Sequence, residues 1–313
     1  MELIYLDGFL KSNEKLNICG SISSTIGMFD GFHLGHKELI KKLLSVAKEK
    51  GEKSSVITFD IHPDFILNKR ENSGYLLSFK DKVKMIEAFN IDYLFVFTFN
   101  KEFSSLTHTE FEDVLERLNI NTLVIGKDTK YGYKGLGSAN TLKEKFDVYV
   151  LDDYYKDNIL VHSKVIRDYL KDGLVEKANR LLGYNFFIKG VVSHGRQIGR
   201  TYNVKTANID LDDQYNYLLN GVYGVVVILD GKKYTGICNI GNNPSFNYTK
   251  TKKLEVNIFD FNQDIYGVEL CVELVTFIRR EMVFSSKEEL KKQIEIDTLK
   301  YEKYLKERIW DLQ

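Results

Sequence analysis

The sequence contains few cysteines, no excess of either charge and no long apolar run, and each absence narrows the class of protein. Cys19, Cys238 and Cys271 are widely separated and form no C-x-x-C pair, which argues against a disulfide framework and a zinc ribbon. Lys plus Arg and Asp plus Glu both total 44, so no nucleic-acid arm or basic membrane patch is expected. No apolar stretch is long enough to cross a bilayer. We therefore expect a cytoplasmic protein whose partners are small molecules, not nucleic acid or membranes, and the sequence leaves a homo-oligomer open.

The length of 313 residues predicts two domains, because single domains usually hold about 100 to 200 residues. In the first half, amphipathic helices alternate with short, continuously apolar strands, which is typical of a parallel sheet covered by helices on both faces. The helices are expected at residues 39–50 with Gly51 as the C-terminal cap, at 78–88, and from Thr107, where Thr107-x-x-Glu110 forms a capping box. The strands are expected at 54–59, 93–99, 122–126 and 147–151.

The periodicity changes in the second half. After two short helices at 163–171 and 174–182, residues 186–277 are dominated by strand-like runs, and Asp230-Gly231 is a strong hairpin signal. A final helix is expected from Ser286, where Ser286-x-x-Glu289 forms a capping box, and the apolar stripe of this helix is expected to pack on the strands. We predict an α/β chain: a Rossmann-like nucleotidyltransferase domain with a parallel sheet at 1–184, then an antiparallel β-barrel with a C-terminal helix at 185–313.

The segment GMFDGFHLGH, residues 27–36, joins a short strand to the first helix. Such loops, at the carboxyl ends of parallel strands, are where α/β folds bind ligands. Gly35 lets the backbone approach a phosphate, while His33 and His36 face it at a helix N-terminus, where the dipole favours anions. The alternatives are two structural histidines or a metal site, and the latter lacks a nearby third ligand. The pattern favours phosphate binding.

This segment resembles the H-x-G-H signature of the nucleotidylyltransferase superfamily, in the GxFDGxHxGH form of bifunctional riboflavin kinase/FAD synthetases. Three further segments resemble motifs of that family in the same order: TFDIHP at 58–63, GKDTKYG at 126–132 and VHSKVIR at 161–167. In the last, His162 and Lys164 stand where the family has Ser and Thr. The resemblance extends through nearly the whole chain.

The resemblance implies that the phosphate of FMN attacks the α-phosphorus of ATP and releases pyrophosphate, with no covalent enzyme intermediate. It assigns His33 and His36 to catalysis at the triphosphate, and His62 and Asp128 to the flavin side. Asp128 could equally be a loop-capping carboxylate. Mg²⁺ would bridge the phosphates. The remaining residues assigned to ATP or its phosphates are Gly27, Phe29, Asp30, Gly31, Gly35, Ser163 and Arg167.

In the second half, GVVSHGRQIGRTYNVKTANID at 190–210 resembles the nucleotide loop of riboflavin kinases, GxVxxGxxxGRxLGxPTANI. The resemblance assigns Gly195, Gly199 and Arg200 to ATP, and Thr206 and Asn208 to ATP and Mg²⁺. A glycine-rich barrel turn without a ligand is the alternative. Asn203 and Lys205 depart from the family's Gly and Pro.

LEVNIFDF and IRREMVF also follow the family order. The resemblance makes Glu255 the general base toward the riboflavin 5′-hydroxyl and places Arg279 on the flavin side. Pattern alone would make Glu255 a solvent-facing strand carboxylate. The expected function is phosphorylation of riboflavin to FMN followed by adenylylation of FMN to FAD. One alternative is an FMN adenylyltransferase whose barrel only binds flavin; another is a nucleotidyltransferase for a pantetheine or nicotinate phosphate, which leaves the second half unexplained.

Overall fold

The chain folds into two compact units that divide between Ser163 and Lys164. The computed structural model describes residues 1–313 except 7, 13, 62–73, 194–205, 243–251 and 311–313. The predicted switch of periodicity near Tyr184 therefore lies about 20 residues after the division. Two helices, α7 (Ser163–Lys171) and α8 (Val175–Leu182), occupy the interval.

The first unit is built on a six-stranded parallel sheet, as the alternating pattern predicts. Its strand order is β1-β4-β3-β2-β5-β6. The chain starts with β1 at one edge, continues with β2 in the centre, moves through β3 to β4 beside β1, and then adds β5 and β6 on the other side of β2. The strands are β1 (Glu2–Tyr5), β2 (Ile22–Ile26), β3 (Lys53–Phe59), β4 (Tyr93–Phe97), β5 (Ile120–Gly126) and β6 (Asp147–Leu151). The edge strand β1 was not predicted, because only four residues form it and three of them are exposed.

Two expected helix signals of this unit are confirmed, although α1 begins five residues before the predicted start at residue 39. Thr107 and Glu110 form both bonds of the predicted capping box, and Gly51 ends α1 in the left-handed conformation at φ 66°. The helices are α1 (Leu34–Lys50), α3 (Phe79–Glu87), α4 (Lys101–Ser105), α5 (His108–Arg117) and α6 (Ala139–Leu142), with the 3₁₀ turn η1 (Tyr133–Gly135) and the short hairpin β7 (Tyr155–Lys156) to β8 (Ile159–Leu160).

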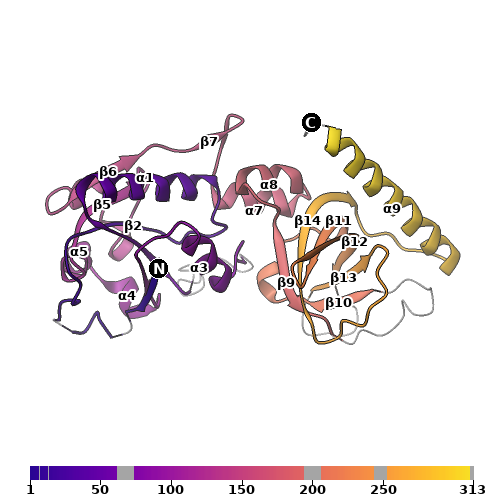
Figure 1. Cartoon of the computed structure of the whole chain (residues 1–313), viewed down its shortest axis with the longest axis horizontal. Coiled ribbons are helices and arrows are strands. Elements are labelled where there is room, and N and C mark those ends of the chain that lie inside the picture. The colour runs from indigo at the N-terminus through magenta and orange to yellow at the C-terminus, as the bar shows by residue number, and fades with distance from the viewer. Residues whose placement is uncertain (7, 13, 62–73, 194–205, 243–251, 311–313) are drawn as a thin grey trace. The chain divides into compact units, whose positions relative to one another are not determined.

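Both faces of the parallel sheet are covered (Figure 1). On one face, α5 buries Phe111, Val114 and Leu115 in a core that includes Ile57 and Phe95 of the central strands. On the other face, α1 lies along the sheet and buries its own apolar side. This arrangement leaves the carboxyl ends of β2 and β3 open to the loops that follow them.

The second unit is the predicted antiparallel barrel. Its six strands follow the order β10-β13-β12-β11-β14-β9. A bridge between Ser193 and Asn208, with Ser193 N donating to Asn208 O at 2.8 Å, joins the two ends of that order. The strands are β9 (Phe187–Val191), β10 (Ala207–Asp210), β11 (Gly221–Leu229), β12 (Lys232–Asn242), β13 (Lys252–Ile258) and β14 (Glu269–Arg279), with the 3₁₀ turn η3 (Asp213–Tyr215).

The predicted hairpin is confirmed. Asp230 and Gly231 have φ of 48° and 76°, and Leu229 pairs with Lys232 across the turn. Two residues with positive φ are what a type I′ turn requires, and Asp and Gly tolerate that conformation.

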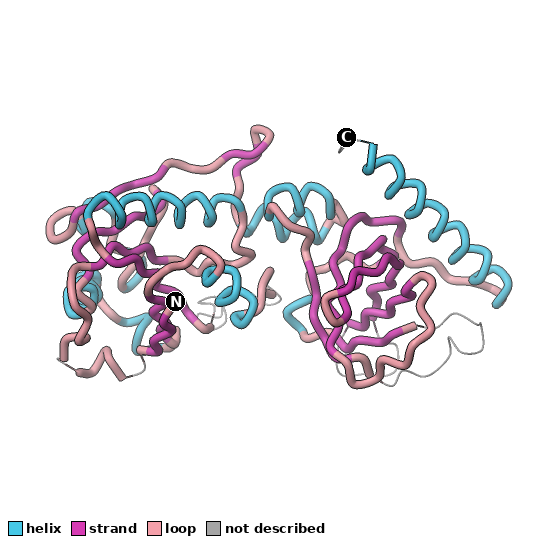
Figure 2. Tube along the Cα trace, viewed as in Figure 1, coloured by secondary structure: helices cyan, strands magenta, loops and turns pink. Residues whose placement is uncertain are grey.

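The last helix, α9 (Lys287–Trp310), packs against the barrel as expected (Figure 2). The ring of Tyr301 is fully buried, and its hydroxyl donates to the carbonyl of Val225 at 3.1 Å. Gly224 makes room for this ring, since a Cβ there would lie 2.2 Å from it. The helix start differs from the predicted capping box: Glu289 N bonds to Ser286, but the Glu289 carboxylate bonds to Ser285.

Candidate functional site

The loop between β2 and α1, residues 27–33, is here called the histidine loop, and it has a backbone conformation that few residues adopt. Phe29 and Phe32 have φ of 50° and 34°, although both carry large side chains, and Gly31 has φ of 74°. Positive φ costs a non-glycine residue about 1 to 3 kcal/mol, and such strain concentrates at functional sites. Both phenylalanine rings are buried, at 0% and 1% exposure, so burial of their side chains holds the loop in this shape.

The loop delivers two histidines to the start of α1. His33 is the N-cap, and its Nδ1 accepts a hydrogen bond from His36 N at 3.4 Å. The two imidazole rings stack with centroids 3.6 Å apart. Gly35 permits this, because a Cβ at that position would come within 3.3 Å of His33 Nδ1. The predicted arrangement of two imidazoles at a helix N-terminus is present.

Both histidines are neutral near pH 7. Burial, with a smaller contribution from the nearby His162, lowers the pKa of His33 from 6.5 to about 3. Burial lowers the pKa of His36 as well, with His33, His162 and Lys82 adding to the effect. Since His33 Nδ1 is an acceptor, a neutral His33 carries its proton on Nε2, where it can donate to an external oxygen.

His36 has one ring nitrogen that the described residues do not satisfy. Its Nδ1 is buried and has no hydrogen-bond partner in that part of the chain. Buried polar atoms are nearly always paired in folded proteins, so this nitrogen is available to a ligand that reaches the start of α1. The neighbouring α1 N-terminus favours an anion there.

Asp30 and Ser163 fasten this loop. The buried Asp30 carboxylate accepts from Leu76 N at 2.8 Å, and the Ser163 hydroxyl donates to the Asp30 carbonyl at 2.8 Å. Thus the side chain of Ser163, which the resemblance assigns to phosphate, contacts the backbone of the histidine loop. Arg167 is half-buried in α7, on the other side of the division between the units.

The structure adds little to the two flavin contacts predicted in the first unit, His62 and Asp128. Asp128 is exposed just after β5, at the same edge of the sheet as the histidine loop. Gly27 lies in the loop itself, where its N–H donates to the carbonyl of Ile57 at 3.1 Å. His62 falls outside the described residues.

In the barrel, three polar side chains form one row across neighbouring strands. Glu255 of β13 lies opposite Asn208 of β10 on one side and Asn239 of β12 on the other. Directly opposite residues of antiparallel strands point to the same face, with Cβ atoms about 4.5 to 5.5 Å apart. Glu255 is exposed, whereas Leu254 and Val256 beside it are buried. The sequence motif predicted Glu255 and Asn208 separately; the register brings them together.

The side-chain oxygens at and near Asn208 are suited to bind a hard cation. Thr206 directly precedes β10, and the Asn208 amide nitrogen lies 3.5 Å from the Thr206 carbonyl oxygen as its donor. That orientation turns the amide oxygen the other way, and hydroxyl, amide and carboxylate oxygens are the ligands that Mg²⁺ takes. Among the described residues, no group of three His, Cys, Asp or Glu side chains could hold a metal ion by itself. Gly195, Gly199 and Arg200 fall outside the described residues.

Arg279 has a partner within the protein. Its guanidinium binds the carboxylate of Asp297 on α9, with Nε at 2.9 Å and Nη2 at 2.8 Å from Oδ2. Asp297 is only 1% exposed, so the pair joins α9 to β14. The flavin role suggested for Arg279 stays a prediction, and this structure gives the residue a structural one.

Two residues that sequence reasoning missed lie beside these sites. Asn239 completes the polar row of the barrel, and its amide nitrogen donates to Glu281 at 3.4 Å. Lys82 reaches the backbone of the histidine loop from α3. A signal existed for Lys82: it stands four residues before the buried Ile86, on the apolar side of a helix where a lysine is unusual.

Over the helices that the structure describes, no segment is both long and apolar enough to cross a membrane. A family model described as FAD synthetase matches residues 17–165, and one described as riboflavin kinase matches residues 182–305. The two models together therefore span both units, with a gap that covers most of α7 and α8.

Curated relatives resemble the chain over most of its length. The bifunctional riboflavin kinase/FMN adenylyltransferase of Bacillus subtilis (strain 168) is 38% identical over 280 residues, which are 87% of this chain and 89% of the relative. The protein of the same name from Buchnera aphidicola subsp. Acyrthosiphon pisum is 38% identical over 289 residues, covering 90% and 92%.

A solved structure shares the fold of the chain. A crystal structure described as a macrolide-efflux protein from Streptococcus pneumoniae superposes with a TM-score of 0.85 at 29% identity, covering 95% of this chain and 98% of that one. Its description names a different activity from that of the curated relatives, so this likeness contributes the fold alone. On the family models, the curated relatives and the two sites, the chain belongs to the bifunctional riboflavin kinase/FMN adenylyltransferase family.

Proposed function

We propose that this chain transfers the γ-phosphoryl group of ATP to riboflavin in its barrel, and then the adenylyl group of a second ATP to FMN in its parallel-sheet domain. The single observation that carries the proposal is that one chain holds two groups of side chains, each suited to one of the reactions. Two stacked neutral imidazoles stand at the start of α1, and a carboxylate stands in a polar row on the barrel.

In adenylyl transfer, a phosphate oxygen of FMN forms a bond to the α-phosphorus of ATP, while the bond from that phosphorus to the bridging oxygen breaks and pyrophosphate leaves. The charge that needs stabilising lies on phosphate oxygens. The Nε2–H of His33, a ring N–H of His36 and the N-terminus of α1 can each supply a donor or positive potential there. Neutral imidazoles can serve in this role, because each keeps one ring N–H that can donate to a phosphate oxygen.

In phosphoryl transfer, Glu255 accepts the proton of the riboflavin 5′-hydroxyl as the oxygen bonds to the γ-phosphorus, and ADP leaves. Its exposed position leaves the carboxylate accessible to a substrate. Thr206 and Asn208 would hold Mg²⁺ beside it. When bound, Mg²⁺ neutralises phosphate charge.

We propose that residues 1–184 serve the adenylyltransferase and residues 185–313 the kinase, with ATP, riboflavin and FMN as substrates and Mg²⁺ with both nucleotides. The family models support this division, since they end at 165 and begin at 182. We further propose the cytoplasm as the location, because both reactions consume ATP.

Purified protein incubated with ATP, Mg²⁺ and either riboflavin or FMN tests both activities, with the flavins separated by chromatography. FAD from both substrates is expected. FAD from FMN alone would remove the kinase and leave the barrel a binding module.

Two variants separate the sites. Glu255→Gln is expected to lower FMN formation from riboflavin at least about 100-fold while FAD forms from supplied FMN at the wild-type rate. His36→Ala is expected to give the reverse, with FMN accumulating from riboflavin and little FAD. Equal loss of both activities in either variant would contradict the assignment of separate sites.

A further inference from the structure

Lys82 is a lysine buried in the first unit, with 5% of its surface exposed. It lies in the middle of α3. Lys84, in the last turn of the same helix, is exposed. Lysine is almost never fully buried unless its ammonium has partners, so the contacts of Lys82 define what it does.

All three N–H groups of Lys82 have acceptors. Nζ donates to the carbonyl of Met28 at 3.1 Å, to the hydroxyl of Thr58 at 3.1 Å and to the carbonyl of Phe59 at 2.8 Å. Hydrogen bonds from a charged donor are about twice as strong as those between neutral groups. One side chain therefore joins two segments of backbone that are 30 residues apart in sequence.

These two segments are the ones that follow the central strands. Met28 lies in the histidine loop after β2, between Gly27 and the strained Phe29. Thr58 and Phe59 end β3, and Asp60 follows, where its Oδ2 accepts from Thr98 at 2.9 Å. The sheet itself pairs β2 with β3 only as far as Ile26 and Ile57. Lys82 continues that connection past the end of the ladder.

The charged and titratable groups facing Lys82 come from three places. Asp30 in the histidine loop and Asp60 after β3 favour its charged form, and His36 on α1 is affected by its charge. The ring of Phe79 lies 5.2 Å from Nζ within α3. Burial outweighs the two carboxylates and lowers the pKa of Lys82 from 10.5 to about 8.

We propose that Lys82 is a positioning residue for adenylyl transfer: its ammonium fixes the backbone of the histidine loop to the end of β3. This inference rests on the function proposed above. Displacement of catalytic groups by about 1 Å can cost on the order of 100-fold in rate, so loss of the three bonds should act on turnover. All three N–H groups of the ammonium bond to the protein, so its effect on the reaction passes through the loop.

The test compares Lys82→Met, which keeps the length of the side chain and removes its charge, with Lys84→Met on the exposed side of the same helix. Lys82→Met is expected to lower kcat for FAD formation from FMN and ATP at least about tenfold, with KM for FMN changed less than about twofold. Lys84→Met should match the wild type. Riboflavin phosphorylation by the same samples should be unchanged in both variants, which shows that the barrel is intact, and the unchanged KM for FMN shows that the first unit is folded.

The pH profile supplies a readout that a general loss of packing would not move. As pH rises through about 8, Lys82 loses its proton and one of its three donors, so wild-type kcat for adenylyl transfer should fall. Lys82→Arg keeps its charge at all these values. The kcat of Lys82→Arg should therefore begin to fall at a pH at least about one unit higher than that of the wild type. This comparison remains decisive if Lys82→Met does not fold.

Three results overturn the inference. If Lys82→Met forms FAD at a rate within about twofold of that of Lys84→Met, the three hydrogen bonds do not matter for turnover. If kcat of Lys82→Arg falls at the same alkaline pH as kcat of the wild type, the charge of Lys82 does not matter either. A wild type that makes no FAD from FMN would instead remove the proposed function, and this inference with it.

Discussion

At the scale of single residues, the stacked histidines have a consequence for stability as well as for phosphate binding. The pKa of His33 is 6.5 when exposed and about 3 in the folded protein, so between these values the unfolded chain binds the additional proton. Stability from this residue is therefore complete above pH 6.5 and is lost as the pH falls toward 3.

His33→Asn tests that linkage, because Asn is a good N-cap but does not titrate. For the wild type, this histidine should cost about 1.4 kcal/mol of unfolding free energy at pH 5.5 relative to pH 7.5. The free energy of unfolding of the variant should fall by less between the two pH values, as measured by urea unfolding followed by circular dichroism. Equal losses in both proteins would show that His33 titrates normally in the folded state.

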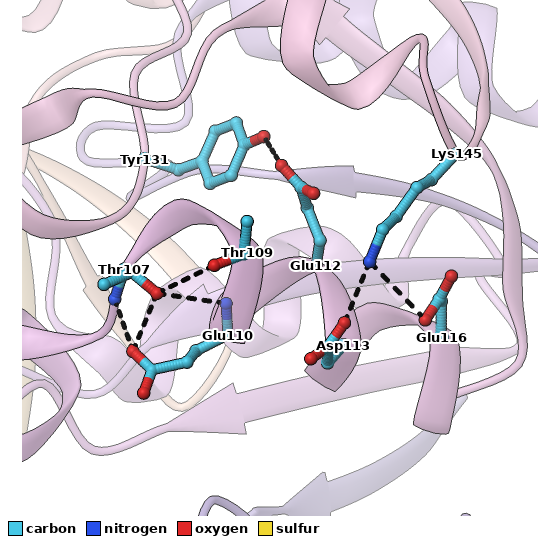
Figure 3. Close-up of polar contacts among 8 residues, drawn as sticks. All are labelled: Thr107, Thr109, Glu110, Glu112, Asp113, Glu116, Tyr131 and Lys145. Carbon is cyan, nitrogen blue, oxygen red and sulfur yellow. Dashed lines mark hydrogen bonds and ion pairs between the residues drawn. The ribbon is translucent and has the colours of Figure 1, made fainter.

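At the scale of helices and strands, the turn after β5 is held to α5 by buried polar groups (Figure 3). The hydroxyl of Tyr131 donates to the carboxylate of Glu112 at 2.5 Å, and it lies 2.7 Å from the Thr141 hydroxyl. Burial, with the bond to Glu112, raises the pKa of Tyr131. Glu112 is 4% exposed, so its carboxylate depends on these contacts.

Tyr131→Phe is expected to destabilise the first unit by about 1 to 3 kcal/mol, because Glu112 then keeps a buried acceptor without this donor. Adding Glu112→Leu should recover part of that loss, since removing both partners costs less than removing one. Thermal unfolding of the two variants measures this difference. A double variant less stable than Tyr131→Phe would indicate that Glu112 has another essential partner.

At the scale of the whole molecule, α7 and α8 raise the question of which unit they stabilise. Asn179 of α8 is buried; its amide nitrogen donates to the Leu274 carbonyl at 2.9 Å, and its oxygen accepts from Phe186 N at 2.8 Å. Thr276 of β14 also donates to Glu176 at the start of α8. These contacts connect α8 to the barrel, although the change in sequence pattern comes after it.

We expect a fragment of residues 164–313 to be more stable than one of residues 185–313. The shorter fragment lacks α8, so the Phe186 N–H and the Leu274 carbonyl lose their partner, at about 1 kcal/mol or more for each bond. Urea unfolding of the two fragments measures the difference. Equal stability would place the working boundary at 184, where the sequence pattern puts it.

Much of the fold could be predicted, because the strong local signals agree with the tertiary structure. The capping box at Thr107, the left-handed end of α1 at Gly51 and the turn at Asp230-Gly231 are each decided by a few neighbouring residues. The strand β1 escaped prediction because its pairing with β4, 88 or more residues away, determines it.

The residues of the candidate sites also divide into those that local motifs predict and those that depend on distant segments. The motifs located His33, His36, Asn208 and Glu255, because each lies in a short run of recognisable residues. Neither the register that sets Asn239 beside Glu255 nor the reach of Lys82 into the histidine loop could be predicted, because both depend on segments distant in sequence. Arg279 was assigned from its motif, and its pairing with Asp297 depends on how α9 packs.

The two compact units belong to one polypeptide, and this fixes the stoichiometry of their sites. Every copy that is synthesised adds one site of each kind, so changing expression scales both reactions together. On the proposed function, the ratio of FMN to FAD then cannot be adjusted by making more of one activity. It must follow from the relative turnover and saturation of the two sites.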